Sequence, residues 1–259
     1  MAKKHTIDTI KAAKNSEKLV MITAYDALFA KLFSPLVDMI LVGDSLNMIF
    51  AAKPDTLSAS MEQMLYHTQA VCAGAPESFT IFDMPYGSYT NKKDALKNAI
   101  RVYQESYADA VKLEGGKEKC HIVSHLTKNG IAVMGHIGLL PQHVRGAGGY
   151  KVANNKDKLI EDAKALEDAG VFAIILEGVK ADIAKDITAS VEVPVIGIGA
   201  GKDVDGQVLV WSDMLGFFED FKPKFVKRYL NGAKLVKEAV AAYAQEVKNG
   251  RFPTKDYSY

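Results

Sequence analysis

Eight short apolar runs recur along the chain, and segments with a different, helical pattern separate them. Most of the runs are almost continuously hydrophobic, which is typical of parallel strands packed on both faces. They occupy residues 18–26, 38–45, 79–85, 110–116, 131–138, 171–178, 193–201 and 207–213. We therefore predict eight strands of a parallel sheet.

The segments between these runs carry apolar residues at steps of three and four, the spacing of one helix face. In 91–108, Asn91 is a candidate N-cap. The apolar face predicted for this helix consists of Leu96, Ile100, Tyr103 and Tyr107. A second helix is predicted over 156–170, and a long closing helix over 223–250 that begins at Pro223.

Eight strands that alternate with helices in 259 residues fit a (β/α)8 barrel of the TIM type, for which about 250 residues is typical. The alternative is an open doubly wound sheet, which usually has a glycine-rich phosphate-binding turn after its first strand. Here the first run continues into TAYDALF, which contains no glycine. We therefore predict a single α/β domain over 1–259, a barrel with an N-terminal lead-in and a long C-terminal helix.

The composition is that of an ordinary globular protein, with 48% hydrophobic and 24% charged residues. The net charge of +1 gives no bulk attraction for nucleic acid or an anionic membrane surface. No apolar stretch approaches the roughly 20 residues that cross a bilayer. The N-terminus lacks the apolar core of an export signal, and Cys72 and Cys120 match no metal motif. We therefore expect a cytoplasmic protein with reduced thiols.

Polar residues stand at the ends of most of the apolar runs. They are Asp26, Asp44 with Ser45, Asp83, Lys112 with Glu114, His136 and Glu177. Because ligands bind at the C-terminal ends of the strands in a barrel, the fold would bring these side chains to one mouth. In the fourth run, Lys112 and Glu114 are two residues apart and share one side of the strand. We expect them to face the barrel interior, since Val111 and Leu113 suit the helix layer.

A Lys–Glu pair that satisfies itself would explain the fourth run alone. Asp44 and Asp83 at neighbouring strand ends add two carboxylates, which would repel each other and rise in pKa without a cation. Mg²⁺ usually binds one or two carboxylates together with water and substrate oxygens. We therefore predict a magnesium site with Asp44 and Asp83 as ligands and Glu114 bound directly or through water. His121 and His125 belong to a predicted helix at the opposite end of the next strand, where a solvated or packing role is expected.

Two further strand-end residues are candidates for proton chemistry and substrate contact. Glu177 follows the apolar stretch FAIIL, so desolvation should raise its pKa and prepare it as a general base. A plain loop glutamate is the alternative, because Gly178 follows it. His136 is either a hydrogen-bonding partner of a substrate oxygen or a satisfied core histidine. The segment GIGAG at 197–201 suits phosphate binding or close backbone packing.

Eight strings follow one another in a fixed order over about residues 5–250. They are TAYD (23–26), LVGDSL (41–46), YHT (66–68), AVKLEGG (110–116), MGHIGLLPQ (134–142), GYKV (149–152), GIGAG (197–201) and DGQVLVWSDMLG (205–216). Together they resemble the ketopantoate hydroxymethyltransferase family. The resemblance implies a barrel enzyme that uses Mg²⁺ and takes a hydroxymethyl group from 5,10-methylenetetrahydrofolate. The acceptor would be 3-methyl-2-oxobutanoate, in pantothenate biosynthesis.

The resemblance also implies roles for individual residues. The family's metal site would comprise Asp44, Asp83 and Glu114, its keto-acid contacts Asp44 with Ser45 and Lys112, and its proton acceptor Glu177. We further expect Asp83 and His136 among the substrate contacts. The family forms large homo-oligomers built from pentameric rings, so a homo-oligomer such as a decamer is implied here.

The chain departs from the family's pattern after GDSL, where Asn47 replaces the usual glycine. The following stretch, IFAAKPDTLSAS at 49–60, is also unlike the family's usual version. Asn tolerates a positive φ better than most residues, so we expect the turn to survive. We expect the departures to affect loop closure over the site, and hence substrate affinity, more than the chemistry.

Three alternative functions remain open from the sequence. Lys112 would be the nucleophile of a Schiff-base aldolase, although nearby carboxylates would keep it protonated. A Mg²⁺-dependent carbon–carbon lyase would use the same barrel without the folate donor. A barrel that only binds a keto acid, or serves as a scaffold, would gain nothing from the buried charges that it maintains.

Overall fold

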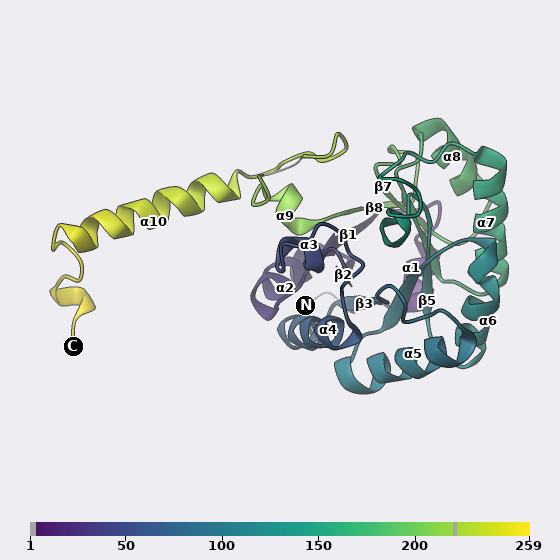
Figure 1. Cartoon of the computed structure of the whole chain (residues 1–259), viewed down its shortest axis with the longest axis horizontal. Helices are drawn as coiled ribbons and strands as arrows, with labels where there is room; N and C mark the ends of the chain where they lie inside the picture. The colour runs from purple at the N-terminus through teal and green to yellow at the C-terminus, as the bar shows by residue number, and fades with distance from the viewer. Residues whose placement is uncertain (1–3, 220–221) are drawn as a thin grey trace. The chain divides into compact units, whose positions relative to one another are not determined.

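The computed structural model describes residues 4–219 and 222–259 and divides the chain into two compact units, Met1–Val210 and Trp211–Tyr259. In the first unit, eight parallel strands close into a barrel in chain order (Figure 1). The strands are β1 (Leu19–Thr23), β2 (Met39–Val42), β3 (Phe79–Asp83), β4 (Ala110–Glu114), β5 (Val133–Gly138), β6 (Ala173–Glu177), β7 (Val195–Ile198) and β8 (Gly206–Leu209). The predicted (β/α)8 barrel is confirmed, and the open sheet is wrong because β1 pairs with β8.

Helices connect the strands and surround the barrel (Figure 1). Those of the first unit are α1 (Ile7–Ala12), α2 (Ala27–Phe33), α3 (Leu46–Ile49), α4 (Met61–Gly74), α5 (Lys92–Ser106), α6 (Cys120–Lys128), α7 (Lys156–Asp168) and α8 (Ala181–Ala189). Short 3₁₀ turns form η1 (Ser34–Leu36), η2 (Lys117–Lys119) and η3 (Pro141–His143). The loops that follow the C-terminal ends of the strands therefore meet at one mouth.

Apolar side chains fill the part of the barrel interior that lies toward the N-terminal ends of the strands. Ala110 of β4 belongs to this interior cluster together with Met39, Ile81, Met134, Phe172 and Ile196. Because side chains alternate along a strand, Lys112 and Glu114 share the side of Ala110. The charged residues of β4 therefore lie above the apolar layer, at the end of the barrel where the site is expected.

Helix α5 begins as predicted, since the side chain of Asn91 accepts a hydrogen bond from the N–H of Asp94. Its predicted apolar face is wrong, because Ile100 is 40% and Tyr107 83% exposed. The residues that the helix buries are Ala95, Ala99, Val102 and Ser106. Both sets of residues have helical spacing, and the small side chains are the ones that allow the helix to pack closely on the strands.

The second unit contains α9 (Trp211–Met214), α10 (Gly232–Lys248) and the 3₁₀ turn η4 (Lys255–Tyr257). The predicted closing helix over 223–250 thus begins nine residues late, at Gly232. The N–H of Tyr229 donates to the carbonyl of Met214, and the N–H of Gly232 donates to that of Leu215, both at 2.8 Å. These bonds to the preceding turn replace the helical bonds that Pro223 and the apolar spacing suggested.

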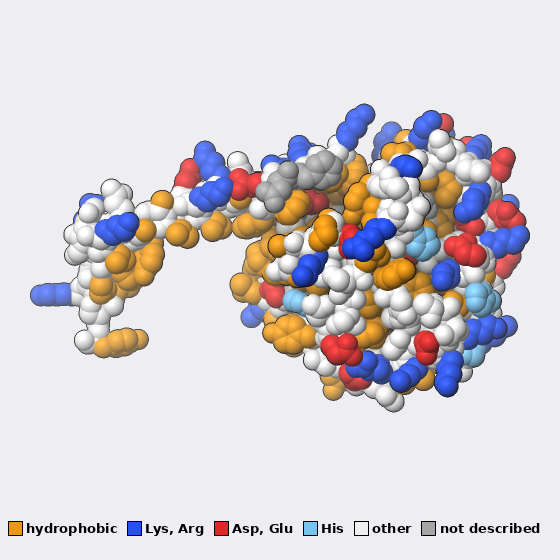
Figure 2. All heavy atoms as spheres, in the orientation of Figure 1, with side chains coloured by type: hydrophobic (Ala, Val, Ile, Leu, Met, Phe, Trp, Pro, Cys, Tyr) orange, Lys and Arg blue, Asp and Glu red, His pale blue; other side chains and the backbone are white. Residues whose placement is uncertain are grey.

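The surface carries charges of both signs. Figure 2 shows Lys and Arg side chains interspersed with Asp and Glu over the face in view, as the net charge of +1 leads one to expect. Cys72 on α4 and Cys120 on α6 are free thiols, as predicted. Within residues 4–219 and 222–259, no helix is both long enough and apolar enough to cross a membrane.

Candidate active site

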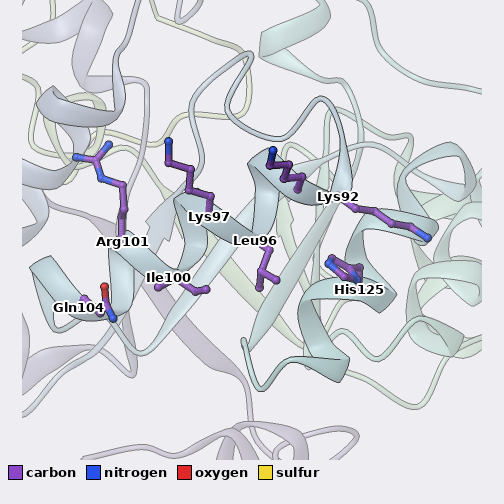
Figure 3. A pocket seen from close by; sticks show the side chains of 8 residues that line it. Lys92, Leu96, Lys97, Ile100, Arg101, Gln104 and His125 are labelled. Carbon is purple, nitrogen blue, oxygen red and sulfur yellow. The ribbon is translucent and has the colours of Figure 1, made fainter.

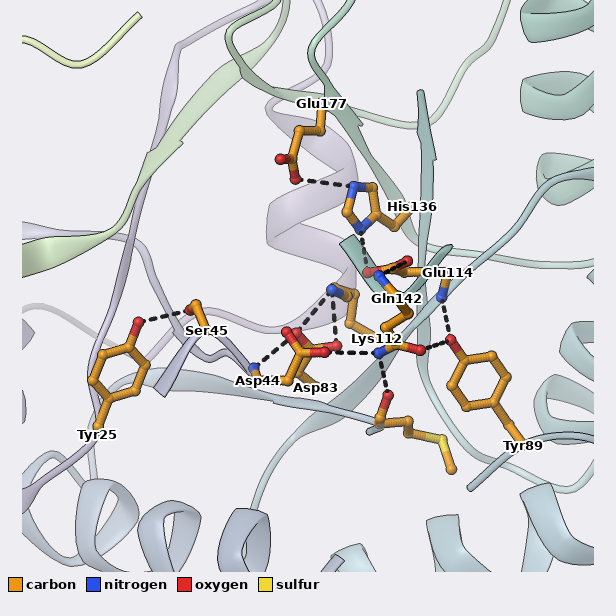
Figure 4. A network of polar contacts seen from close by, with 11 residues as sticks. Tyr25, Asp44, Ser45, Asp83, Tyr89, Lys112, Glu114, His136, Gln142 and Glu177 are labelled. Carbon is orange, nitrogen blue, oxygen red and sulfur yellow. Dashed lines mark hydrogen bonds and ion pairs between the residues drawn. The ribbon is translucent and has the colours of Figure 1, made fainter. Parts of the chain in front are cut away.

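The barrel brings all but one of the predicted polar strand-end residues together at one mouth (Figure 4). Asp44 and Ser45 follow β2, and the residues contributed by β3 to β6 are Asp83, Lys112, Glu114, His136 and Glu177. Asp26 instead caps α2, where its side chain accepts a hydrogen bond from the N–H of Phe29. Asp26 therefore has a local structural role, whereas the other polar strand ends form one cluster.

Lys112 ties two carboxylates into the centre of this cluster. Its Nζ lies 2.8 Å from both side-chain oxygens of Asp83, and the N–H of Asp44 donates to Asp83 Oδ2 at 3.2 Å. Burial raises the pKa of Asp44 to about 7, and the charge of Asp83 adds to the effect while Lys112 opposes it. Burial alone would lower the pKa of Lys112, but the surrounding carboxylates, Asp83 foremost, raise it above its ordinary value. The lysine is therefore a buried cation.

Gln142 links the carboxylates, although it lies beyond a strand end and the sequence did not single it out. From η3, its Nε2 donates to Asp44 Oδ2 at 2.9 Å and to the Met84 carbonyl at 3.0 Å, while its backbone N–H donates to Glu114 Oε2 at 3.0 Å. The hydroxyl of Tyr89 donates to Gln142 Oε1 and accepts from the N–H of Glu114. The only sequence signal for this residue was its place in the family string that ends in LLPQ.

Replacing Tyr89 with phenylalanine should lower the free energy of unfolding by about 1–3 kcal/mol, because Gln142 Oε1 and the Glu114 N–H lose a buried partner. Tyr103→Phe is a matched control, since the Tyr103 hydroxyl likewise makes two hydrogen bonds: it donates to the backbone carbonyl of Asp109 and accepts from the N–H of Ala132. Urea unfolding should report a similar loss for both variants. Only Tyr89→Phe should reduce turnover, and equal activity of the two variants would contradict a role for Tyr89 in the site.

His136 lies between Glu177 and Glu114 (Figure 4). Its Nε2 is 3.3 Å from Glu177 Oε2, and its Nδ1 is 3.8 Å from Glu114 Oε1. Burial, with the nearby charge of Lys112, lowers the pKa of His136 well below its ordinary value, so the imidazole is neutral. Burial raises the pKa of Glu177 from 4.5 to about 7, against the opposing charge of Lys112. Glu177 therefore titrates near neutrality, which suits a general base.

The residues present fit a hard divalent cation, although they do not form a preorganised three-residue cage. Within the described ranges, no three His, Cys, Asp or Glu side chains converge to hold a metal ion. Asp44 and Asp83 suffice for Mg²⁺, which completes its shell with water and substrate oxygens. Glu114 Oε1 is buried and makes no hydrogen bond to any residue that the structure describes, while Gln142 engages Oε2. This arrangement suits contact of Glu114 with the ion through water.

Asn47 does not occupy the strained turn that the sequence suggested. It lies within the short helix α3, and positive φ angles among non-glycine residues occur instead at Asn15, Ala52 and Tyr107 in the described ranges. Its side chain is buried and donates to the Asp55 carbonyl at 2.8 Å and to Ser58 Oγ at 3.0 Å. The expectation that Asn47 relies on tolerance of positive φ is therefore wrong; the residue fastens the following loop.

Two of the hollows in the described part of the chain have the volume of small-molecule sites, and one of these two adjoins the cluster. The first, of about 650 Å³, is lined by residues of α5 and α6 alone, among them Lys92, Lys97, Arg101 and His125 (Figure 3). The second, of about 710 Å³, is lined by Leu57, Ser58, Tyr86, Gln142, His143 and Arg145. Gln142 touches Asp44, so the second hollow borders the candidate active site.

The barrel and its mouth, with a buried lysine, four carboxylates and a neutral histidine, define a (β/α)8-barrel enzyme. The model of the ketopantoate hydroxymethyltransferase family matches residues 4–255, and the chain belongs to this family. It is therefore a hydroxymethyltransferase, and the prediction of an enzyme is confirmed.

Similar proteins from three bacteria bear the name 3-methyl-2-oxobutanoate hydroxymethyltransferase. The protein of Nitratiruptor sp. is 72% identical over the whole of both chains, and that of Sulfurimonas denitrificans is 64% identical, also over the whole of both chains. The protein of Helicobacter pylori strain G27 is 60% identical over 99% of this chain and 97% of its own.

Solved structures share the fold at low identity. A phosphonopyruvate hydrolase superposes with a TM-score of 0.65 at 15% identity, covering 98% of this chain and 90% of its own. A 2,3-dimethylmalate lyase of the PEP mutase/isocitrate lyase superfamily gives 0.63 at 13% identity, covering 97% and 91%. At this level of identity the likeness concerns the fold alone.

Proposed function

We propose that the chain transfers a hydroxymethyl group from 5,10-methylenetetrahydrofolate to 3-methyl-2-oxobutanoate, giving 2-dehydropantoate for pantothenate biosynthesis. Three changes make up the reaction. A proton leaves C3 of the keto acid, the methylene carbon leaves the folate nitrogens and forms a new bond to C3, and water supplies the hydroxyl oxygen. The membership of the family supports this assignment.

The observation that carries the proposal is the buried group of Asp44, Asp83 and Lys112 at a mouth that also holds Glu177. Asp44 and Asp83 would hold Mg²⁺, with Glu114 acting through water. When bound, the ion would stabilise the negative charge that develops on the keto oxygen. Lys112 is a fixed cation for the substrate carboxylate, and Ser45 Oγ, 2.8 Å from the Tyr25 hydroxyl, is a further substrate contact.

Glu177 is the proposed base for the proton on C3. With a pKa raised to about 7, it is ionised in a large fraction of molecules at neutral pH and still basic enough to accept a proton. His136, neutral and 3.3 Å from Glu177, would orient that carboxylate and contact a substrate oxygen. The same raised pKa predicts that kcat/KM falls as the pH drops below about 7.

The Schiff-base alternative requires an uncharged Lys112. The carboxylates around Lys112 raise its pKa, so the amine that would attack a carbonyl is present in a very small fraction of molecules. A carbon–carbon lyase would need no folate donor. Both alternatives are therefore separable from the proposal by experiment.

Incubation with 3-methyl-2-oxobutanoate, methylenetetrahydrofolate and Mg²⁺ should yield 2-dehydropantoate, detected by mass spectrometry. Treatment with EDTA should abolish product formation, and added Mg²⁺ should restore it, because two neighbouring carboxylates and a keto acid need a cation between them. Omitting methylenetetrahydrofolate should abolish product formation as well. Product formation that survives EDTA, together with borohydride trapping of substrate on Lys112, would establish the Schiff-base mechanism instead.

Three broader expectations belong to the same proposal. The free thiols of Cys72 and Cys120 suit a reducing compartment, so we propose a cytoplasmic location. The family resemblance supports assembly as a homo-oligomer. Light scattering would measure the molar mass of the assembly. Substrate and donor are the proposed partners, and the net charge of +1 gives no bulk attraction for nucleic acid or an anionic membrane.

A further inference from the structure

Three loops of the barrel mouth line the hollow of about 710 Å³ beside the active site. Leu57 and Ser58 line it from the loop after β2, Tyr86 from the loop after β3, and Arg145 from the loop after β5. Its volume falls within the roughly 300–1,000 Å³ of small-molecule sites. The buried cluster itself is nearly closed, since Asp44, Asp83 and Lys112 are each at most 3% exposed.

The wall of this hollow is held by a buried carboxylate. Asp55, which is 7% exposed, accepts from Arg145 Nε and Nη2 on Oδ2, both at 2.8 Å, and from the N–H of Leu57 on Oδ1 at 3.1 Å. Asn47 fastens the same segment by donating to the Asp55 carbonyl and to Ser58 Oγ. Arg145 Nη1 takes part in neither bond to Asp55, and among the described residues no hydrogen bond occupies it, so it can donate to a ligand. The loops after β2 and β5 are thus joined by the Asp55–Arg145 pair, with the guanidinium at the edge of the hollow.

We propose that this hollow binds the folate donor, with Tyr86 contacting its planar rings and Arg145 pairing with the carboxylate of its glutamate. This inference rests on the proposed function. The reaction needs two ligands of very different size, and the proposed place of the small keto acid is the buried cluster. The donor must place its one-carbon unit next to that cluster, and Gln142 lines the hollow while touching Asp44. An aromatic side chain and a guanidinium match the two ends of the donor, a heterocycle and a carboxylate.

The test separates binding of the donor from activation of the keto acid. Tyr86→Ala and Arg145→Met should each raise the KM for methylenetetrahydrofolate about tenfold, the loss of one ring contact or one charge-assisted pair. The KM for the keto acid should be unchanged. Exchange of the C3 proton with deuterated water, followed by NMR without donor, should persist in both variants. Tyr66→Ala on α4 and Arg101→Met on α5 are matched controls outside the hollow and should change none of these quantities.

A substrate without the glutamate makes the test independent of how the variants fold. With methylenetetrahydropteroate as donor, the KM of the wild type for the donor should rise about tenfold. Arg145→Met should show no further rise in this KM, because the substitution and the missing glutamate remove the same contact. Additive losses, or an unchanged donor KM in Tyr86→Ala and Arg145→Met, would overturn the inference. Failure of the wild type to exchange the C3 proton would instead refute the proposed function itself.

Discussion

Replacing Lys112 with methionine should lower the free energy of unfolding by about 3–5 kcal/mol and abolish turnover, because it leaves two carboxylates buried without their cation. Lys112 is 3% exposed and contacts both oxygens of Asp83, next to Asp44. The loss should be measured by urea unfolding at pH 8. It should shrink at acidic pH, since carboxylates with a raised pKa destabilise the fold only once they ionise. Added Mg²⁺ should recover part of the stability.

Lys14→Met provides a matched control for this variant. Lys14 is also a buried lysine in a 2.8 Å ion pair, with Asp205, and it donates to the Thr188 carbonyl. The control should lose comparable stability without any gain from Mg²⁺, and at a temperature where it stays folded it should retain its KM for the keto acid. An active Lys112→Met enzyme would contradict the proposed role of Lys112 in holding the substrate carboxylate.

Glu177→Gln should reduce kcat by about 10²–10⁴-fold, the usual contribution of a general base, while affinity for the keto acid and Mg²⁺ is retained. The C3 exchange reaction without donor should fall by the same factor, because proton removal is the step that Glu177 performs. Calorimetric titration would measure binding, and NMR would measure exchange. Exchange at the wild-type rate in this variant would assign the base to another residue.

The same substitution should stabilise the fold at high pH. The pKa of Glu177 is raised by burial from 4.5 to about 7, so the folded state binds the proton more tightly than the unfolded state does. Its contribution to stability is therefore present below pH 4.5 and is lost as the pH rises through 7. At pH 8, Glu177→Gln should be more stable than the wild type by about 1–3 kcal/mol. No gain is expected at pH 4, where both side chains are neutral, and Glu105→Gln on the exposed side of α5 serves as the control.

The sequence by itself determined the barrel and most of its polar mouth. Eight apolar runs have the length and continuity of parallel strands, and each of them overlaps a strand, although several strands end before the predicted bound. The last run was predicted over 207–213, but β8 ends at Leu209 and Trp211 begins α9. Alternation along β4 put Lys112 and Glu114 on one side, which follows from strand geometry alone. Closure of the sheet then had to bring Asp44, Asp83 and Glu177 near them, because each stands at the same end of its own strand.

The spacing of apolar residues did not determine which face of a helix packs against the barrel or where the last helix begins. In α5 two different faces have helical spacing, and only contact with the strands selected the one with small side chains over the one with Ile100 and Tyr107. The start of α10 likewise depended on hydrogen bonds from Tyr229 and Gly232 to the turn after α9. Both choices depend on neighbours that are absent from a local pattern.

Only the tertiary structure decided how the site is braced. Gln142, Tyr89 and the Asp55–Arg145 pair lie in the loops that follow the strands rather than at the strand ends themselves, and none of them shows a motif of its own. Loops that fold back over the mouth place them against the carboxylates and beside the hollow. A short-range sequence pattern reflects the local preference of each residue. The hydrogen bond between Gln142 and Asp44 joins loops nearly 100 residues apart, so it forms only once the barrel has closed.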